Sequence, residues 1–269
     1  MALIAVDIGN TNITLGLHDD AGTMTHRWAL TSNPSRTADE YRMFMRLLAA
    51  ECPAMLQASQ VVIGSVVPSL QLLMEDAFDQ LLPTAQRLVV THTTPLPVAN
   101  AYPVPSEVGI DRLANAVGGF HRFGAPCIVV DFGTATTIDV LAPPLAGASD
   151  TRPRYLGGII LPGPRLAAEA LNLRTARLPM VSPRATERII ADNTVEAIRS
   201  GLFWGMVGAI DYLIQEAARE SQLSSYIAVA TGGLGRDFLG RCKTLSQYEP
   251  ELTLFGLHEI ARFQRNITR

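Results

Sequence analysis

Alternating apolar and polar positions predict that the chain begins with three antiparallel strands. The segments that predict them are residues 3–8, 11–19 and 23–30. Each is rich in apolar and β-branched residues, and turn-forming Gly-Asn and Asp-Asp-Ala-Gly segments separate them. From Thr37 to about Glu51 the apolar spacing becomes helical, with Ser35 or Thr37 as the capping residue. The apolar face of this helix consists of Tyr41, Met45, Leu48 and Ala49.

The next patterns complete a first α/β unit. They predict, in order, a buried strand at 61–67, a helix at 69–82 and a short strand at 87–90. Residues 93–108 are rich in proline and lack periodicity, which predicts a loop laid over a surface.

The second half of the chain repeats the opening pattern. After a helix at 111–123, an apolar strand ends in VDFGTATTIDVL at residue 130, which matches VDIGNTNITLGL at residue 6. Both share V-D-x-G followed by a threonine-containing strand, and this repeat indicates two related halves.

The remaining elements of the second half are less regular. Residues 142–153 form a Pro-, Gly- and Ser-rich excursion, longer than a tight hairpin. After it the pattern predicts a strand at 155–163, a helix at 194–221, a strand at 225–230 that runs into TGGLG, and a closing helix at 257–267.

Composition narrows the class of protein. The 269 residues are 48% hydrophobic and 17% charged, with a formal net charge of −3, which fits a folded protein of two domains. Lys243 is the only lysine among 22 basic residues, so chemistry that needs a Schiff-base or phosphate-loop lysine is excluded. No basic cluster points to nucleic acid or to an anionic membrane.

Cysteine usage and the N-terminus indicate the compartment. Cys52, Cys127 and Cys242 lie far apart and have no C-x-x-C spacing, so neither disulfides nor a zinc site is expected. The N-terminus reaches Asp7 without a basic stretch and does not resemble a signal peptide. The uncharged segment 52–74 contains prolines, glutamines and serines that a bilayer core would disfavour, so we expect a cytoplasmic protein.

Three glycine-containing turns carry the candidate chemistry. In the first, Asp7 is followed by Gly9, Asn10 and Thr11, a combination that could bind polyphosphate and hydrated magnesium, although it is also ordinary hairpin chemistry. The second turn begins at Asp131, whose carboxylate stands at the end of a buried strand. A carboxylate in such a position usually has a positively charged partner, such as a cation.

The threonines after Asp131 also suit a strand without any ligand. The third turn, TGGLG at 231–235, could receive a ribose or base beside a helix N-terminus, or could serve packing alone.

Six motifs follow one another along the chain: DIGNTN at 7–12, GIDR at 109–112, DFGTATT at 131–137, GGIILPG at 157–163, RTARLP at 174–179 and TGG at 231–233. Together they resemble type III pantothenate kinase. The resemblance implies an α/β fold of two duplicated ribonuclease H-like (actin-like ATPase) domains with mixed sheets flanked by helices, binding ATP between them. We expect the domains to cover residues 1–116 and 117–269, with the last helix packing back on the first domain.

The resemblance also implies the ATP and metal contacts. ATP would be held by Asp7, Ile8, Gly9, Asn10, Thr11, Asn12, Ile13 and Thr14, and also by Thr134, Gly232 and Gly233. Asp7 would bind Mg²⁺ through water, and Asp131 would bind an activating monovalent cation, K⁺ or NH₄⁺. An arginine could supply that positive charge instead.

The implied pantothenate pocket consists of Tyr102, Gly109, Ile110, Asp111, Arg112 and Thr175. Asp111 would be the catalytic base, although its place at a helix start also suits a helix-stabilising acid. Arg112 would hold the pantothenate carboxylate through two parallel hydrogen bonds. For Tyr102 the alternative is a loop tyrosine that covers apolar surface, and for Thr175 it is a helix-flanking turn residue.

The expected function is ATP-dependent phosphorylation of pantothenate to 4′-phosphopantothenate, the first step of coenzyme A biosynthesis. Two alternatives stay open: a same-fold kinase for another hydroxy acid, and a catalytically weak nucleotide-binding accessory factor in transcriptional regulation. The resemblance implies a homodimer, and we expect no nucleic-acid or membrane partner. The apolar-faced helix at 194–221 is a candidate interface element, although a helix inside the core would show the same pattern.

Overall fold

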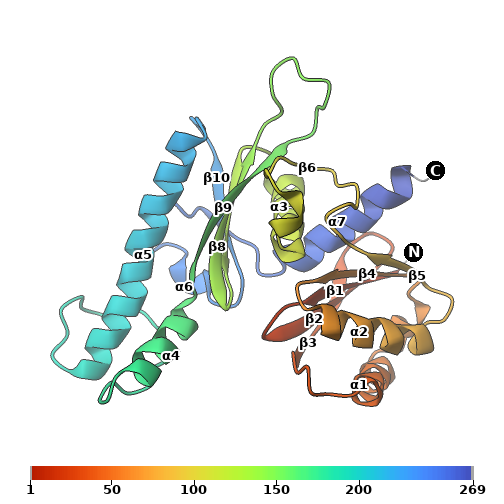
Figure 1. The fold of residues 1–269 in the computed structure, drawn as a ribbon, viewed down its shortest axis with the longest axis horizontal. Helices are drawn as coiled ribbons and strands as arrows, with labels where there is room; N and C mark the ends of the chain where they lie inside the picture. Colours follow the sequence, from red (N-terminus) through yellow and green to blue (C-terminus); the bar gives the residue numbers. More distant parts are fainter. Residues whose placement is uncertain (1, 268–269) are drawn as a thin grey trace. The chain divides into compact units, whose positions relative to one another are not determined.

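The computed structural model describes residues 2–267 as two compact units (Figure 1). Unit 1 extends to His121 and resumes at Leu252, and unit 2 covers Arg122–Glu251. The boundary expected from the sequence, between residues 116 and 117, falls inside helix α3 (Ile110–Phe123). The last helix, α7 (Leu252–Ile267), is part of unit 1.

Unit 1 is built on one mixed sheet. Its strands are β1 (Leu3–Ile8), β2 (Asn12–His18), β3 (Met24–Thr31), β4 (Gln60–Ser65) and β5 (Gln86–Val89), in the order β3-β2-β1-β4-β5. The first three strands are antiparallel, as predicted, and β4 and β5 run parallel to β1. The other elements of this part of the chain are α1 (Ala38–Glu51), 3₁₀ turns at Pro53–Gln57 and Pro105–Glu107, α2 (Pro68–Leu81) and the short β6 (Ala99–Asn100).

Local sequence explains where α1 begins. Of the two predicted caps, the structure uses Thr37, whose Oγ1 accepts a hydrogen bond from the backbone N–H of Glu40 at 3.3 Å. Glu40 Oε2 in turn accepts from the Thr37 N–H at 2.7 Å, which completes a capping box.

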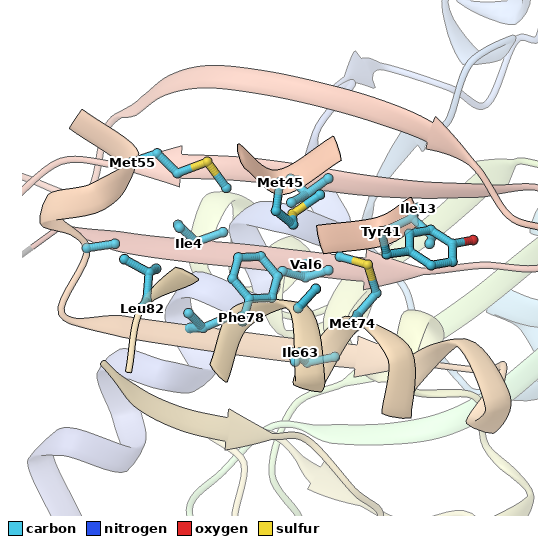
Figure 2. Close-up of a cluster of buried hydrophobic side chains, with 14 of the residues drawn as sticks. Ile4, Val6, Ile13, Tyr41, Met45, Met55, Ile63, Met74, Phe78 and Leu82 are labelled. Atoms are coloured by element: carbon cyan, nitrogen blue, oxygen red, sulfur yellow. The ribbon is translucent and has the colours of Figure 1, made fainter. Parts of the chain in front are cut away.

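The pleat of the sheet divides unit 1 into two faces. Ile4 and Val6 of β1 and Ile63 of β4 point into a buried cluster with side chains of α1 and α2 (Figure 2). Each fully buried side chain of this kind contributes about 1.5–3 kcal/mol. Because successive side chains in a strand alternate, Asp7 of β1 and Gly64 of β4 lie on the other face, which α7 covers.

Unit 2 repeats the topology of unit 1. Its strands are β7 (Cys127–Phe132), β8 (Ala135–Ala142), β9 (Arg154–Pro162), β10 (Ile227–Thr231) and β11 (Gln247–Tyr248), and within the unit their order is β11-β10-β7-β8-β9. Again the first three strands are antiparallel and the later two parallel to the first. The duplication predicted from the V-D-x-G repeat is therefore confirmed.

Helices cover the apolar face of the second sheet. They are α5 (Thr194–Glu220) and the four-residue α6 (Gly235–Phe238), while α4 (Pro164–Arg174) packs on α5. Phe132 of β7 stacks on Phe238 at 4.3 Å between ring centroids, and Phe238 stacks on Phe203 of α5 at 4.7 Å. Asp131, next to Phe132, consequently lies on the opposite face.

No helix within residues 2–267 combines the length and apolar character needed to cross a membrane.

Candidate active site

The first predicted turn presents an acid beside an exposed loop. Asp7 is half-buried near the end of β1 and pairs with Thr14 of β2, whose hydroxyl donates to Asp7 Oδ2 at 3.4 Å. The Gly9 N–H donates to the Asn12 carbonyl at 3.0 Å, which closes the turn between the strands. Ser32 Oγ donates to the Gly9 carbonyl at 2.5 Å and ties the turn to the chain beyond β3.

The residues at the tip of this turn, Asn10, Thr11 and Asn12, are exposed, whereas Ile8 and Ile13 are buried beneath it. Polar side chains of the turn therefore reach solvent above a buried apolar base. Such an arrangement can bind phosphate oxygens, while a carboxylate next to it can hold a hydrated divalent cation.

Asp111 lies in the first turn of α3 with its carboxylate folded back on its own backbone. The Arg112 N–H donates to Asp111 Oδ1 at 2.8 Å, and a Cβ on Gly109 would overlap this same oxygen. Burial raises the pKa of Asp111, and this effect exceeds the opposing hydrogen bond and positive charge of Arg112. A carboxyl group with a raised pKa is a better proton acceptor, as a general base requires.

Two contacts bring Asp111 to the same end of the sheet as Asp7. Ile110 Cγ2 lies 3.1 Å from where a Cβ on Gly64 would stand, and Gly64 pairs with Asp7 in the parallel ladder. Cγ1 of Val66, which follows β4, lies 3.5 Å from where a Cβ on Gly109 would stand. The carboxyl ends of β1 and β4 and the start of α3 therefore meet on one face of unit 1.

Two other predicted substrate residues of unit 1 are half-buried. Arg112 follows Asp111 in the first turn of α3. Tyr102 lies in the loop that precedes α3, and its N–H donates to Asn100 Oδ1 at 3.1 Å.

In unit 2, Asp131 sits where three backbone segments converge. It pairs with Thr137 of β8 and with Thr231 of β10. Gly232 has a φ of +81°, and a Cβ there would overlap Asp131 Oδ1 and approach the Phe132 carbonyl oxygen to 2.8 Å. Only glycine fits this position without strain.

The carboxylate of Asp131 and the carbonyl oxygen of Phe132 thus face one narrow cradle made by Gly232. Oxygen donors of this kind suit a hard cation. Among residues 2–267, no three or more His, Cys, Asp and Glu side chains are grouped to hold a metal ion, so any ion at Asp131 would depend on backbone or ligand oxygens as well.

Gly163 supports the second turn, a role that the sequence did not reveal. Its N–H donates to the Thr134 carbonyl at 3.0 Å, and a Cβ there would overlap the carbonyls of Gly133 and Thr134. The signal was present in GGIILPG, whose last glycine had no assigned task.

The third turn is followed by a helix, as predicted. The helix is the four-residue α6, and Leu239 after it adopts an extended conformation. Gly233 is exposed, and apart from its chain neighbours no atom lies within 4 Å of where a Cβ on it would stand. The space beside Gly233 is therefore open to a ligand, but no neighbouring atom requires glycine at this position.

Thr175, the last predicted substrate residue, ends α4 in an exposed turn. Its hydroxyl donates to the Leu171 carbonyl at 2.8 Å and accepts from the Leu178 N–H at 3.3 Å. The predicted residues thus fall into two groups, one in each unit. Unit 1 carries residues 7–14, 102 and 109–112, and unit 2 carries residues 131, 134, 175, 232 and 233.

Comparison with known proteins identifies the family of this chain. The sequence model of the type III pantothenate kinase family matches residues 3–216. A type III pantothenate kinase of Acidobacterium capsulatum is 37% identical over 271 residues, covering 98% of this chain and 95% of that protein. One of Paramagnetospirillum magneticum is 37% identical over 267 residues, with 99% and 98% covered.

A solved structure shows the same architecture. It is the activator of 2-hydroxyisocaproyl-CoA dehydratase from Clostridium difficile with bound ADPNP, which matches with a TM-score of 0.53 and 12% identity over 100% of this chain and 97% of that chain. At this identity the similarity shows the fold alone, two mixed sheets flanked by helices as in actin-like ATPases. The sequence matches extend over nearly the full length, and the chain belongs to the type III pantothenate kinase family.

Proposed function

We propose that this chain transfers the γ-phosphoryl group of ATP to the primary hydroxyl of pantothenate, giving 4′-phosphopantothenate and ADP in the first step of coenzyme A biosynthesis. The observation that carries the proposal is the placement of Asp111. Its carboxyl group has a raised pKa and lies at the same end of the sheet as the exposed turn after Asp7, in a member of this family.

Asp111 is the proposed general base. As the pantothenate oxygen forms its bond to the γ-phosphorus, the bond from that phosphorus to the β,γ-bridging oxygen breaks, and the hydroxyl proton passes to Asp111. Phosphoryl transfer otherwise needs mainly alignment and charge stabilisation. Arg112 beside it is proposed to bind the pantothenate carboxylate with its two-pronged guanidinium, and Tyr102, Gly109, Ile110 and Thr175 to complete the pocket.

The turn from Asp7 to Thr14 is proposed to bind the ATP phosphates, with Thr134, Gly232 and Gly233 as further ATP contacts. Its exposed polar side chains and the adjacent carboxylate support this role. Asp7 would hold Mg²⁺ through water, and the ion would neutralise charge on the phosphates.

A monovalent cation, K⁺ or NH₄⁺, is proposed at Asp131. The support is the cradle at Gly232, where a carboxylate and a carbonyl oxygen face the same space. In a chain with one lysine, such an ion would add positive charge that other kinases take from a lysine side chain.

We also propose that the protein acts as a homodimer. Four large apolar side chains within one segment of unit 2 are exposed: Leu173, Met180, Ile189 and Ile190. The segment is anchored to α5 by Ser200 Oγ, which donates to the Ile189 carbonyl at 2.6 Å, and by Trp204 Nε1, which donates to Thr186 Oγ1 at 3.1 Å. An ordered apolar surface of this kind favours a protein partner, and sedimentation that gives a monomer would contradict the proposal.

The function is tested with purified protein, ATP, Mg²⁺, K⁺ and pantothenate, with the product identified by mass spectrometry. We expect 4′-phosphopantothenate from the wild type and a loss of turnover of about 100-fold or more in Asp111→Asn, with ATP binding retained. A panel of other hydroxy acids serves as the control for substrate class. Absence of product while a control pantothenate kinase works in the same assay would refute the proposal.

A further inference from the structure

Helices α3 and α7 share one contact point on the sheet of unit 1. A Cβ on Gly64 would lie 2.8 Å from Leu257 Cδ2 of α7 and 3.1 Å from Ile110 Cγ2 of α3. Leu257 is completely buried and Ile110 is 9% exposed. The two side chains therefore meet over a glycine that leaves just enough room for both.

The backbones of the two helices also touch. A Cβ on Gly256 of α7 would overlap the Ala114 carbonyl, and one on Gly118 of α3 would lie 2.6 Å from the Leu252 carbonyl. Thr253 Oγ1 donates to Asn115 Oδ1 at 2.8 Å between the helices. Close backbone contact leaves little freedom for one helix to move without the other.

A buried polar cluster also links α7 to α3 and to β2. Glu259 of α7 is 3% exposed, and its Oε1 accepts a hydrogen bond from Arg262 Nη1 at 3.0 Å and lies 3.1 Å from His258 Nδ1. The other carboxylate oxygen, Oε2, lies 3.4 Å from Nδ1 of His121 in α3. His258 stacks on His18 of β2 with 4.6 Å between ring centroids. Burial alone would raise the pKa of Glu259, but hydrogen bonds from His258 and Arg262 and the charges of His121 and Arg262 lower it to about 2.

These contacts matter for the residue that follows Ile110. Asp111 has its carboxylate pressed against Gly109 and bound to the Arg112 N–H, so its position depends on the orientation of the first turn of α3. Ile110 is the side chain of that turn that meets the sheet at Gly64. If Ile110 loses its support, the turn can tilt and water can reach the carboxylate.

We propose that Leu257 is a positioning residue for Asp111, acting through Ile110 over Gly64, and that α7 is the element that holds the catalytic turn in place. This inference rests on the base role proposed for Asp111 and adds a residue that touches neither substrate nor reacting atoms. The polar cluster at Glu259 holds α7 in the position that this role requires.

The test compares two leucines of α7 that differ in what they support. Leu254 is 1% exposed and lies 3.2 Å from the Cβ position of Gly16 in β2, so Leu254→Ala removes the same side chain from an equivalent contact away from Ile110. The first readout is the titration of Asp111 by carbon NMR in substrate-free protein, with its signal assigned from Asp111→Asn. We expect Leu257→Ala to bring the pKa of Asp111 down towards its ordinary value, and Leu254→Ala to leave it unchanged.

The second readout is turnover. Leu257→Ala should lower kcat by about 10- to 100-fold with little change in ATP affinity, whereas Leu254→Ala should not. Leu257→Met, which keeps the volume of the side chain, should retain the wild-type titration of Asp111 and the wild-type kcat. The milder pair Leu257→Val and Leu254→Val repeats the comparison if either alanine variant fails to fold.

Equal effects of the two substitutions on titration and turnover would overturn the proposal, because Leu257 would then be an ordinary core residue. The NMR experiment needs no substrate, so it decides the positioning role separately. If the wild type makes no phosphopantothenate while Leu257→Ala still shifts the titration of Asp111, the proposed function has failed and the structural coupling stands.

Discussion

His18 should make the stability of this protein depend on pH in a measurable way. It is 1% exposed at the end of β2, where it stacks on His258. Burial first, and then the neighbouring His258, lower the pKa of His18 from 6.5 to about 4, against smaller opposing effects of the Gly16 backbone, Asp19 and Glu259. The folded protein therefore keeps this imidazole neutral at pH values where an unfolded chain would protonate it.

The sign follows from proton binding. Between pH 6.5 and 4 the unfolded chain binds a proton at His18 and the folded chain does not, so the stability present above pH 6.5 is lost as the pH falls. The gap of about 2.5 between the two pKa values corresponds to about 3 kcal/mol in total, of which about 2 kcal/mol is lost by pH 5.

The assay is urea unfolding at a series of pH values between 7.5 and 4.5, followed by circular dichroism. Wild type should lose about 2 kcal/mol more than His18→Gln between pH 7.5 and 5. His26→Gln, which removes an exposed imidazole on β3, is the control for losing a histidine and should follow the wild type. If the difference between wild type and His18→Gln is constant across the series, the burial of neutral His18 is not the source of acid sensitivity and the reasoning fails.

Three further predictions test the site. Asp131→Ala should abolish the response of activity to KCl, and an unchanged response in a salt titration would move the ion site elsewhere. Gly232→Ala should destabilise unit 2 by about 1–3 kcal/mol in thermal unfolding, because of its φ of +81° and the overlap with Asp131, while Gly233→Ala should not; equal effects would contradict the cradle. Arg112→Lys should raise the KM for pantothenate more than it lowers kcat, since a point charge replaces a two-pronged contact, and steady-state kinetics would show an unchanged KM if Arg112 does not bind the carboxylate.

Several elements could be predicted from the sequence because their signals are local. The alternating patterns of β1, β2 and β3, the capping box of α1 and the V-D-x-G repeat are each contained within a few neighbouring residues. The repeat then implied a second sheet of the same topology, which the strand order confirms. The motifs also marked Asp7, Asp111 and Asp131, whose assigned roles stay predictions.

Other elements escaped the sequence because tertiary contacts decide them. Helix α4 was not predicted; it follows directly on Gly163, the glycine that packs against the turn at Thr134. Helix α7 begins at Leu252, five residues before the predicted start, because Leu252 and Leu254 are buried in unit 1 although ELTLF alternates like a strand. The helix expected after TGGLG is the four-residue α6, a length that the sequence pattern did not indicate.

By itself, the sequence determined the duplicated α/β plan, the family and the identity of the acidic residues that carry the candidate chemistry, since each depends on patterns along the chain. Only the tertiary structure decided that Gly64 receives Ile110 and Leu257, that Gly232 faces Asp131, and that His18 and His258 are buried together. These contacts join segments that are distant along the chain, and their geometry depends on close packing, which no local pattern of residues encodes.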